Sequence, residues 1–470
     1  MDIKKSHVDP LESFKEQPIA LMGGSFDPFH NAHRMLAKSA IDALPVEVLL
    51  VMPLGWAPHK TTRMRMAAFR YEMSVRGVLG VPKVLVSDEE IKTPAISYTF
   101  DTVTHLFNKI MPDPLYLVIG SDSFEALPSW YRYKELARKV VFAVARRGDD
   151  NMEKMRELAE RYRQDDDARV VFFNMPPSSL SSSNLRTALQ QGKSVYGDCP
   201  DKVVDLINTY RIYNFQDEYD ALTQEAWNRV RSAEQVAWRY YTQKQRLHAV
   251  SVAQYAARLA LANGVDIEKA FVAGLLHDAA KNLPAKERRF LAEGYLTNHP
   301  FAKNAAKIVK DPSFENEKNT NSTFQTTRTE VVYGKDDGCS CSVQMESSSC
   351  LKMNDSALWA SSLSKNILHG PAGAMLAKKI FGVDDPDILD SICFHSTARP
   401  SMTSLEKVLY LSDKISYDRS FVRLEPIRDR ALHGDLNGAM RLCLDETFVA
   451  LKRKEKNPHP LSIAAYHDLG

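Results

Sequence analysis

Thiols, a dominant charge sign and long apolar runs are all scarce in this chain of 470 residues. Its 6 cysteines are scattered, and none forms a Cys-x-x-Cys pair, so neither a zinc ribbon nor a dithiol redox motif is indicated. Basic and acidic residues nearly balance, at 61 against 59, which leaves no overall field that would recruit nucleic acid or an anionic membrane. No stretch approaches the roughly 18 apolar residues of a membrane span, and no signal-peptide pattern opens the chain. We therefore expect a cytoplasmic protein whose partners are small molecules. A homo-oligomer is also compatible with the sequence.

The chain contains two regions of different pattern, and its length predicts roughly three domains. Residues 18–174 alternate short β-rich runs with amphipathic stretches, which predicts an α/β doubly wound, Rossmann-like parallel sheet with its ligand outside the carboxyl ends of the strands. The expected strands are 19–22, 47–52, 83–86, 115–119, 140–145 and 170–173. From residue 217 onward the apolar spacing is helical, so an all-α domain with a separate core is expected.

The expected domain limits follow from these patterns. They are an N-terminal tail (1–17), a nucleotide-binding domain (18–213), a connecting helix (214–242) and a helical domain (243–469). Residues 303–364 are rich in Asn, Ser and Thr and poor in large apolar side chains. Such a segment cannot bury enough surface to offset its ordering entropy, so we expect a disordered insertion there.

The most informative short motif spans residues 23–33 and reads Gly-Gly-Ser-Phe-Asp-Pro-Phe-His-Asn-Ala-His. It follows the apolar run 19–22, so the expected order is a strand, a glycine turn and the start of a helix that carries the two histidines. The glycines let the backbone approach an anion, and the helix start offers unpaired N–H groups and the positive end of its dipole. His30 and His33 share one face of the first turn and can donate to the same phosphate. The motif therefore predicts a nucleotide-phosphate site rather than a surface or metal-binding pair of histidines.

This motif resembles the signature of the adenylyltransferases in the nucleotidyltransferase superfamily. Four further segments extend the resemblance, within the first 213 residues, to bacterial nicotinate-mononucleotide adenylyltransferase: 58–60, 97–102, 119–122 with Trp130, and 180–186. The resemblance implies transfer of AMP from ATP to nicotinate mononucleotide, which gives deamido-NAD and pyrophosphate in NAD biosynthesis. Because the attacking phosphate is already ionised, catalysis would consist of positioning and charge neutralisation, with Mg²⁺ on the leaving pyrophosphate.

The resemblance also implies the residues of this site. The implied catalytic residues are His30, His33, Lys60 and Arg186. The implied contacts to ATP and nicotinate mononucleotide are Gly23, Gly24, Ser25, Phe26, Thr99, Gly120, Asp122, Trp130, Ser182 and Ser183. Among these, Thr99 and Trp130 are expected at the nicotinate ring and Asp122 at the adenosine pocket.

A second group of chemistry-bearing residues lies in the helical region. His277 and Asp278 follow the apolar run 271–276, and Lys281 comes one turn later. The other members, each beside or within a helical apolar pattern, are His248, His369, His395 and Asp413. Imidazoles and carboxylates without thiolates suit iron, manganese or another borderline divalent ion better than structural zinc. Six such ligands can hold two ions, which predicts hydrolysis of a phosphoester or phosphoanhydride.

The order of these residues resembles the HD phosphohydrolase superfamily. Segments at 365–371, 394–400, 411–415 and 459–460 extend the resemblance to the YqeK-like symmetrical bis(5'-nucleosyl)-tetraphosphatases, which implies hydrolysis of diadenosine tetraphosphate to two ADP. The implied core metal ligands are His248, His277, Asp278 and Asp413, with His369 and His395 as ligands of a second metal or of phosphate. The implied nucleotide contacts are Lys281, Ser396, Thr397 and Arg399. Asp278 and Lys281 are also expected to act in catalysis, Asp278 on the attacking water and Lys281 on the polyphosphate.

Other functions share parts of these motifs. The α/β domain could adenylylate phosphopantetheine or cytidylylate an alcohol phosphate, although segment 97–102 and Trp130 argue against this. The helical domain could sense adenine nucleotides without turnover, which the complete ligand set disfavours. It could also hydrolyse another nucleotide, because metal ligands fix the chemistry and not the base.

Overall fold

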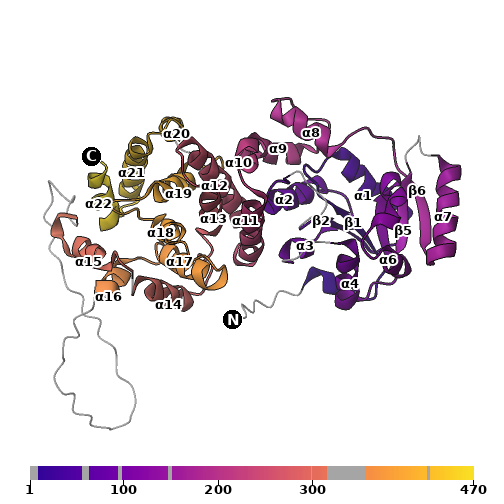
Figure 1. Ribbon diagram of the computed structural model, residues 1–470, viewed down its shortest axis with the longest axis horizontal. Coiled ribbons are helices and arrows are strands. Elements are labelled where there is room, and N and C mark those ends of the chain that lie inside the picture. The colour runs from indigo at the N-terminus through magenta and orange to yellow at the C-terminus, as the bar shows by residue number, and fades with distance from the viewer. Residues whose placement is uncertain are drawn as a thin grey trace, which may run out of the picture.

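The computed structural model describes residues 9–55, 63–93, 98–146, 151–297, 299–314, 355–420 and 424–470 (Figure 1). An α/β half is followed by an all-helical half, as the sequence predicts. None of the described helices combines the length and the apolar character that a membrane span requires.

The α/β half is built on a parallel sheet, whose six described strands have the order β3-β2-β1-β4-β5-β6. The strands are β1 (Ile19–Gly24), β2 (Val48–Pro53), β3 (Val84–Val86), β4 (Leu115–Gly120), β5 (Val141–Arg146) and β6 (Arg169–Asn174). Most residues of β1, β2 and β5 are buried, as expected for strands that helices cover on both faces. The direction of strand succession reverses at the β1–β4 pair, so the carboxyl ends of these two strands flank a crevice.

Helices surround this sheet (Figure 1). They are α1 (Asn31–Ala43), α2 (Ala67–Gly77), α3 (Glu89–Lys92), α4 (Thr99–Ile110), α5 (Ser121–Glu125), α6 (Tyr133–Lys139), α7 (Met152–Asp166), α8 (Ser182–Gln190) and α9 (Asp201–Tyr210). Within the expected N-terminal tail, residues Pro10–Phe14 form a 3-10 helix, and the side chain of Leu11 packs into the core beneath the sheet.

The helical half follows through α10 (Gln216–Asp220) and α11 (Gln224–Ala237). Its remaining helices are α12 (Gln243–Ala262), α13 (Ile267–Leu276), α14 (Ala285–Leu296), α15 (Ala302–Lys310), α16 (Asp355–Ser362), α17 (His369–Ile380), α18 (Pro386–Phe394), α19 (Ser404–Ile415), α20 (Leu424–Leu432), α21 (Leu436–Arg453) and α22 (Pro460–Asp468). The segment expected as one connecting helix therefore folds as α10, α11 and a 3-10 turn at Trp238–Tyr240.

The two halves share a hydrophobic core, which corrects the expectation of separate cores. One cluster runs from Val51 in the sheet through Phe69 of α2 and Trp238 into Ala253 of α12. The opposite face of the sheet has a cluster of its own, which includes Leu117. The shared core arises because the apolar side of α11 and the side chain of Trp238 fill the space between the sheet half and the helical half.

The expected disordered insertion is folded at both of its ends. Its first residues belong to α15 and its last residues to α16, where the side chain of Trp359 is 1% exposed and stacks on Phe394 with ring centroids 5.8 Å apart. The average composition of the segment concealed these short apolar runs, so its limits were wrong. Residues 315–354 lie outside the described part of the chain.

Candidate active sites

The glycine turn lies at the carboxyl end of β1. A Cβ at Gly24 would stand 2.8 Å from Cζ of Phe26, because the Phe26 ring folds under the turn from a backbone with φ of 48°. A Cβ at Gly23 would meet no described atom within 4 Å. The backbone at Gly23 is thus open to an approaching ligand, whereas the space beside Gly24 is filled by the protein.

His30 and His33 lie together at the start of α1. The His30 backbone N–H donates to Nδ1 of His33 over 3.2 Å, and the two rings stack with centroids 3.7 Å apart. His30 is 4% exposed, and burial lowers the pKa of its imidazole to about 4. At neutral pH His30 is therefore uncharged. Its Nδ1 is buried and belongs to the capping box at the start of α1, where it faces the His33 backbone N–H.

A second helix start lies beside this turn. Ser181 caps α8 by accepting a hydrogen bond from the Asn184 backbone N–H, and the hydroxyl of Ser182 donates to the Pro28 carbonyl over 3.1 Å. Arg186, one turn along α8, donates from Nη1 to the Asp27 carbonyl over 2.7 Å. The starts of α1 and α8 therefore lie next to the same turn, where both helix dipoles favour an anion.

The remaining expected residues of this site are spread around the crevice. Gly120 ends β4, Asp122 is exposed on α5 and Thr99 begins α4. The Trp130 side chain is half-buried and packs against the core beneath the sheet. Lys60 and the rest of segment 58–60, together with Ser97, lie outside the described residues, and Ser183 is exposed on the first turn of α8.

Two residues that the sequence reasoning did not assign support the turn from behind. Asp27 is 2% exposed and accepts hydrogen bonds from the Tyr213 hydroxyl at 2.7 Å and from the Arg65 backbone N–H at 3.1 Å. Arg70 is also buried, and its Nη1 donates to the Ser25 carbonyl at 3.2 Å. The motif contains Asp27, but the partners of Asp27 and Arg70 are distant in sequence and could not be inferred from it.

The structure brings all of the expected metal ligands of the helical half into one buried cluster. His277 and Asp278 follow α13, and their neighbours are His248 from α12, Asp413 from α19, His369 from α17 and His395 at the end of α18. Two overlapping groups have donor atoms close enough to hold an ion: His248 with His277 and Asp413, and His277 with Asp278 and His395. Nε2 of His369 lies 3.2 Å from Oδ1 of Asp278 and 3.0 Å from Nε2 of His395, so it adjoins the second group.

Hydrogen bonds to the protein fix the rings in this cluster. Nδ1 of His277 lies 2.8 Å from the Gly274 carbonyl, and Nδ1 of His395 lies 2.7 Å from the Ile392 carbonyl. Each Nδ1 must carry its proton to make such a bond, so each Nε2 presents a lone pair to the cluster. Nε2 of His277 is fully buried and has no hydrogen-bond partner among the described residues. An orphaned, preoriented imidazole nitrogen beside two carboxylates fits a divalent cation.

Charge balance in the cluster also favours bound cations. Burial alone would raise the pKa of Asp278, but His277 and His369 lower it to well below its ordinary value. Burial lowers the pKa of His395 well below its ordinary range, and the adjacent histidines lower it further, so this imidazole is neutral. Lys281 contacts Oδ2 of Asp278 at 2.7 Å, and Lys414 contacts Asp413. Asp278 and Asp413 are therefore held as carboxylates and His395 as a neutral imidazole, the forms in which these side chains bind metal.

The expected nucleotide contacts of this half differ in their surroundings. The Ser396 hydroxyl lies 3.2 Å from Nε2 of His369 and 3.1 Å from Nε2 of His395, whereas Thr397 is 3% exposed. Arg399 forms a two-point ion pair with Glu406, with contacts of 2.6 and 2.9 Å. This pairing supports a structural role for Arg399, which the sequence did not reveal.

Asp418 is a further residue of this cluster, which sequence reasoning missed. Its Oδ2 lies 2.7 Å from Nδ1 of His248, and its Oδ1 accepts hydrogen bonds from the hydroxyls of Ser251 and Ser416. These bonds and the imidazole lower the pKa of Asp418 to about 2, against the opposing effect of burial. Asp418 thus orients Nε2 of His248 toward Asp413, which lies 3.0 Å away.

Comparison with known proteins separates the same two regions. Residues 21–188 match the family described as Cytidylyltransferase-like, and residues 247–328 match the HD domain. A protein of Exiguobacterium sibiricum, named as a probable nicotinate-nucleotide adenylyltransferase, is 32% identical over 196 residues, which are 42% of this chain and 98% of that protein. This chain belongs to the nicotinate-nucleotide adenylyltransferase family. The match to that family covers the α/β half, which we call the adenylyltransferase-family half.

Another relative aligns with both halves. A protein of Mycoplasma genitalium, named as a probable nicotinate-nucleotide adenylyltransferase/Ap4A hydrolase, is 25% identical over 404 residues, which are 86% of this chain and 89% of that protein. Among solved structures, a predicted HD superfamily hydrolase of Clostridium acetobutylicum, described as involved in NAD metabolism, is 28% identical. The match covers 50% of this chain and 94% of that one, with a TM-score of 0.34. The adenylyltransferase-family half is thus followed by an HD domain in the same chain.

Proposed function

We propose that this protein is a bifunctional enzyme. Its adenylyltransferase-family half transfers AMP from ATP to nicotinate mononucleotide, and its HD half hydrolyses diadenosine tetraphosphate symmetrically to two ADP. The observation that carries the proposal is the presence, in one chain, of an open glycine turn between two helix starts and of a buried His/Asp cluster with an orphaned imidazole nitrogen. A relative that aligns with 86% of the chain bears both activities in its name, which supports the pairing.

In the transferase reaction the phosphate of nicotinate mononucleotide attacks the α-phosphorus of ATP, and pyrophosphate leaves. The nucleophile is already an anion, so the protein supplies position and charge neutralisation rather than a general base. The starts of α1 and α8 face this charge with backbone N–H groups and their dipoles. His30 and His33 donate to phosphate oxygens from neutral or charged rings, and Arg186 holds the triphosphate with the N–H groups that it does not use on Asp27.

In the hydrolase reaction the residues of the buried cluster would hold one or two divalent cations. Such ions, when bound, polarise phosphoryl oxygens and lower the pKa of water toward neutrality. Asp278 is placed to orient the attacking water, because its second oxygen is held by Lys281. Lys281, half-exposed at the edge of the cluster, can move from this carboxylate to a polyphosphate oxygen. Iron or manganese in this half, Mg²⁺ with ATP in the other, and the cytoplasmic location stay predictions.

The transferase assignment is tested with the full chain and nucleotide product analysis. His33→Ala should lower adenylyl transfer by about 10²–10³-fold, because a donor that stabilises transition-state charge is typically worth that much. His105→Ala, at an exposed histidine on α4, is the matched control and should retain full activity. Near-normal transfer by His33→Ala would contradict the assignment. Transfer of AMP to phosphopantetheine would show that nicotinate mononucleotide is not the acceptor substrate.

The hydrolase assignment is tested by metal analysis together with product analysis. His277→Ala and Asp278→Ala should each lose bound metal and the hydrolysis of diadenosine tetraphosphate, while His433→Ala, at an exposed histidine, should lose neither. Two ADP from the unmutated protein with Fe²⁺ or Mn²⁺ supports symmetrical hydrolysis, and AMP with ATP indicates a different cleavage. Nucleotide binding without products would make the HD half a sensor.

A further inference from the structure

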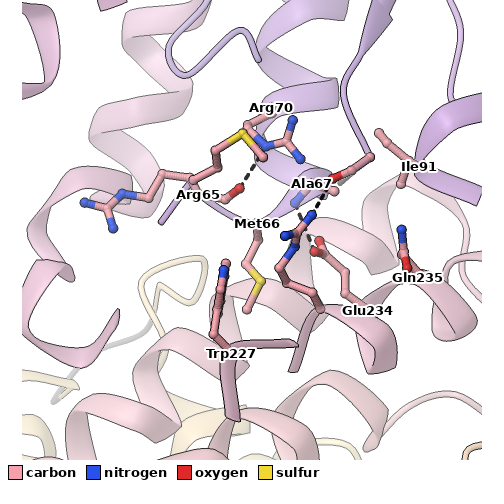
Figure 2. A pocket seen from close by; sticks show the side chains of 11 residues that line it. Arg65, Met66, Ala67, Arg70, Ile91, Trp227, Glu234 and Gln235 are labelled. Atoms are coloured by element: carbon pink, nitrogen blue, oxygen red, sulfur yellow. Dashed lines mark hydrogen bonds between the residues drawn. The ribbon is translucent and has the colours of Figure 1, made fainter. Parts of the chain in front are cut away.

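Helix α11 lies between the halves and outside both matched family regions, which span residues 21–188 and 247–328 (Figure 1). Together with residues that precede and begin α2, its side chains line a small pocket (Figure 2). The lining side chains from α11 are Trp227, Arg231, Glu234 and Gln235. An element that neither domain family accounts for therefore contacts the adenylyltransferase-family half directly.

Glu234 caps helix α2 from across this interface. Figure 2 shows Glu234 directed at the start of α2, where its Oε2 accepts from the Ala67 backbone N–H at 3.0 Å. Its Oε1 accepts from the Ala68 backbone N–H, also at 3.0 Å. The side chain is 6% exposed, and Met66 at the N-cap position provides no side-chain cap of its own. A buried carboxylate that takes the first N–H groups of a helix also faces the positive end of the helix dipole, so the contact fixes the position of α2 strongly.

The start of α2 is in turn bonded to the nucleotide turn. Arg70 on α2 donates from Nη1 to the Ser25 carbonyl at 3.2 Å and to the Leu54 carbonyl at 2.8 Å, and its Nε donates to the Arg65 carbonyl at 2.9 Å. Figure 2 shows the bond between Arg70 and Arg65. The Arg65 backbone N–H also donates to the Asp27 carboxylate. A shift of α2 would therefore displace two residues of the 23–33 motif.

Arg231 makes a second contact from α11. Its Nη2 donates to the Gly55 carbonyl at 2.7 Å. Gly55 follows β2 at the end of the sheet where the glycine turn lies, and the backbone N–H of its neighbour Leu54 donates to the Gly24 carbonyl at 2.9 Å. The same helix thus fixes both the start of α2 and the chain that leaves β2.

We infer that α11 is a positioning element of the adenylyl-transfer site, with Glu234 as its principal positioning residue. The inference rests on the proposed transferase function and adds a dependence of that site on a helix outside the family's own domain. Glu234 touches no reacting group. It acts through α2 and Arg70, which hold the carbonyl side of the nucleotide turn so that its N–H side faces the phosphates.

The test compares Glu234→Gln with Glu225→Gln in the full chain. The first variant keeps the volume of the side chain but turns one acceptor into a donor that faces a backbone N–H. Glu225 lies on the same helix and is exposed, so its variant is a matched control. Glu234→Gln should lower kcat/KM of adenylyl transfer about tenfold, mainly through a higher KM for ATP, because a lost charge-assisted hydrogen bond has that order of effect. Hydrolysis of diadenosine tetraphosphate by the same protein should stay within about twofold.

The outcomes separate positioning from a general loss of folding. A parallel loss of both activities together with a lower Tm, or an unchanged KM for ATP, would overturn the inference. If Glu234→Gln does not accumulate as folded protein, Arg231→Met tests the inference instead, and the same increase in the KM for ATP is expected. Its control is Arg229→Met, at an exposed position of α11. Absence of transfer by the unmutated protein would instead contradict the proposed function, and ATP affinity measured by calorimetry on the same variants would then test the inference.

Discussion

At the scale of single residues, the HD cluster includes supporting side chains outside the expected ligand set. Asp418 holds Nδ1 of His248 over 2.7 Å and is itself held by two serine hydroxyls. A carboxylate in this position fixes the ring orientation and raises the basicity of the nitrogen that binds metal. We therefore expect metal affinity to depend on Asp418 as well as on the candidate ligands.

Asp418→Asn should weaken metal binding by about 10–100-fold while the protein stays folded, because the amide can present the wrong group to Nδ1 of His248. Asp429→Asn is the matched control, since Asp429 also contacts a histidine Nδ1, that of exposed His433, at 3.2 Å. Titration of metal-stripped protein with Mn²⁺ measures the effect. Equal affinity of Asp418→Asn and the control would show that the Asp418 contact does not position His248.

The folding stability of the protein depends on pH through His30. Burial lowers the pKa of its imidazole to about 4 in the folded protein, below the ordinary value of 6.5. Between these two values the unfolded chain binds more protons than the folded one, so this contribution to stability is present above pH 6.5 and is lost as pH falls toward 4. The sign is the reverse of that for a histidine that gains an acidic partner.

His30→Asn keeps an N-cap residue at the start of α1 and removes the titration. Between pH 7 and pH 5, the unfolding free energy of the unmutated protein should fall by roughly 2 kcal/mol more than that of the variant. Urea denaturation at the two pH values, followed by circular dichroism, measures the difference. Identical pH dependence of the two proteins would mean that His30 titrates normally in the fold.

At the scale of elements, the adjacent glycines Gly23 and Gly24 in the turn between β1 and α1 have different surroundings. A Cβ at Gly24 would strike the Phe26 ring, whereas one at Gly23 would enter open space. Gly23→Ala should therefore keep the Tm within about a degree but weaken ATP binding roughly tenfold, because the added methyl lies on the surface that a phosphate would approach. Gly24→Ala should lower the Tm as well. Calorimetric ATP titration and thermal unfolding distinguish the two effects, and unchanged ATP affinity in Gly23→Ala would place the phosphates elsewhere.

The sheet was predictable because its strands are apolar runs bounded by turns. The expected strand at 115–119 is β4 with one more residue, and the expected strand at 170–173 is β6 with one more at each end. The ends of the 303–364 segment were not predictable in the same way. Trp359 is buried by packing on Phe394, and this contact is not visible in a composition average.

The candidate ligands could be identified from local sequence patterns. The residues that position them, or that position the nucleotide turn, could not. His277 and Asp278 are adjacent in sequence, and every other candidate ligand lies beside or within a helical apolar pattern. The contact between Asp418 and His248 joins positions 170 residues apart, and that between Glu234 and Ala68 joins positions 166 residues apart. A single sequence contains no periodicity that relates such positions, so these contacts required the fold.

At the scale of the whole molecule, the two halves are joined by one continuous hydrophobic core. The cluster that includes Phe69 of α2 also includes Ala253 of α12 and Leu275 of α13. Helix α12 carries His248 at the HD site and joins the interface through Arg246, whose guanidinium lies over the Trp238 ring at 4.0 Å. We therefore expect the halves to unfold together, because neither can lose its packing without exposing apolar surface of the other.

Gly274→Ala tests this expectation from the HD side. A Cβ at Gly274 would lie 2.5 Å from Cα of Ala253, so α13 must move away from α12, at a cost of about 1–3 kcal/mol. Gly294→Ala is the control, because its Cβ would meet only the end of the Met375 side chain, at 3.4 Å. In Gly274→Ala, the temperature at which adenylyl transfer is lost should fall together with that of hydrolysis, and calorimetry should show one transition. Two transitions, with the thermal loss of transfer unchanged, would mean that the adenylyltransferase-family half folds independently of the core it shares with α11 and α12.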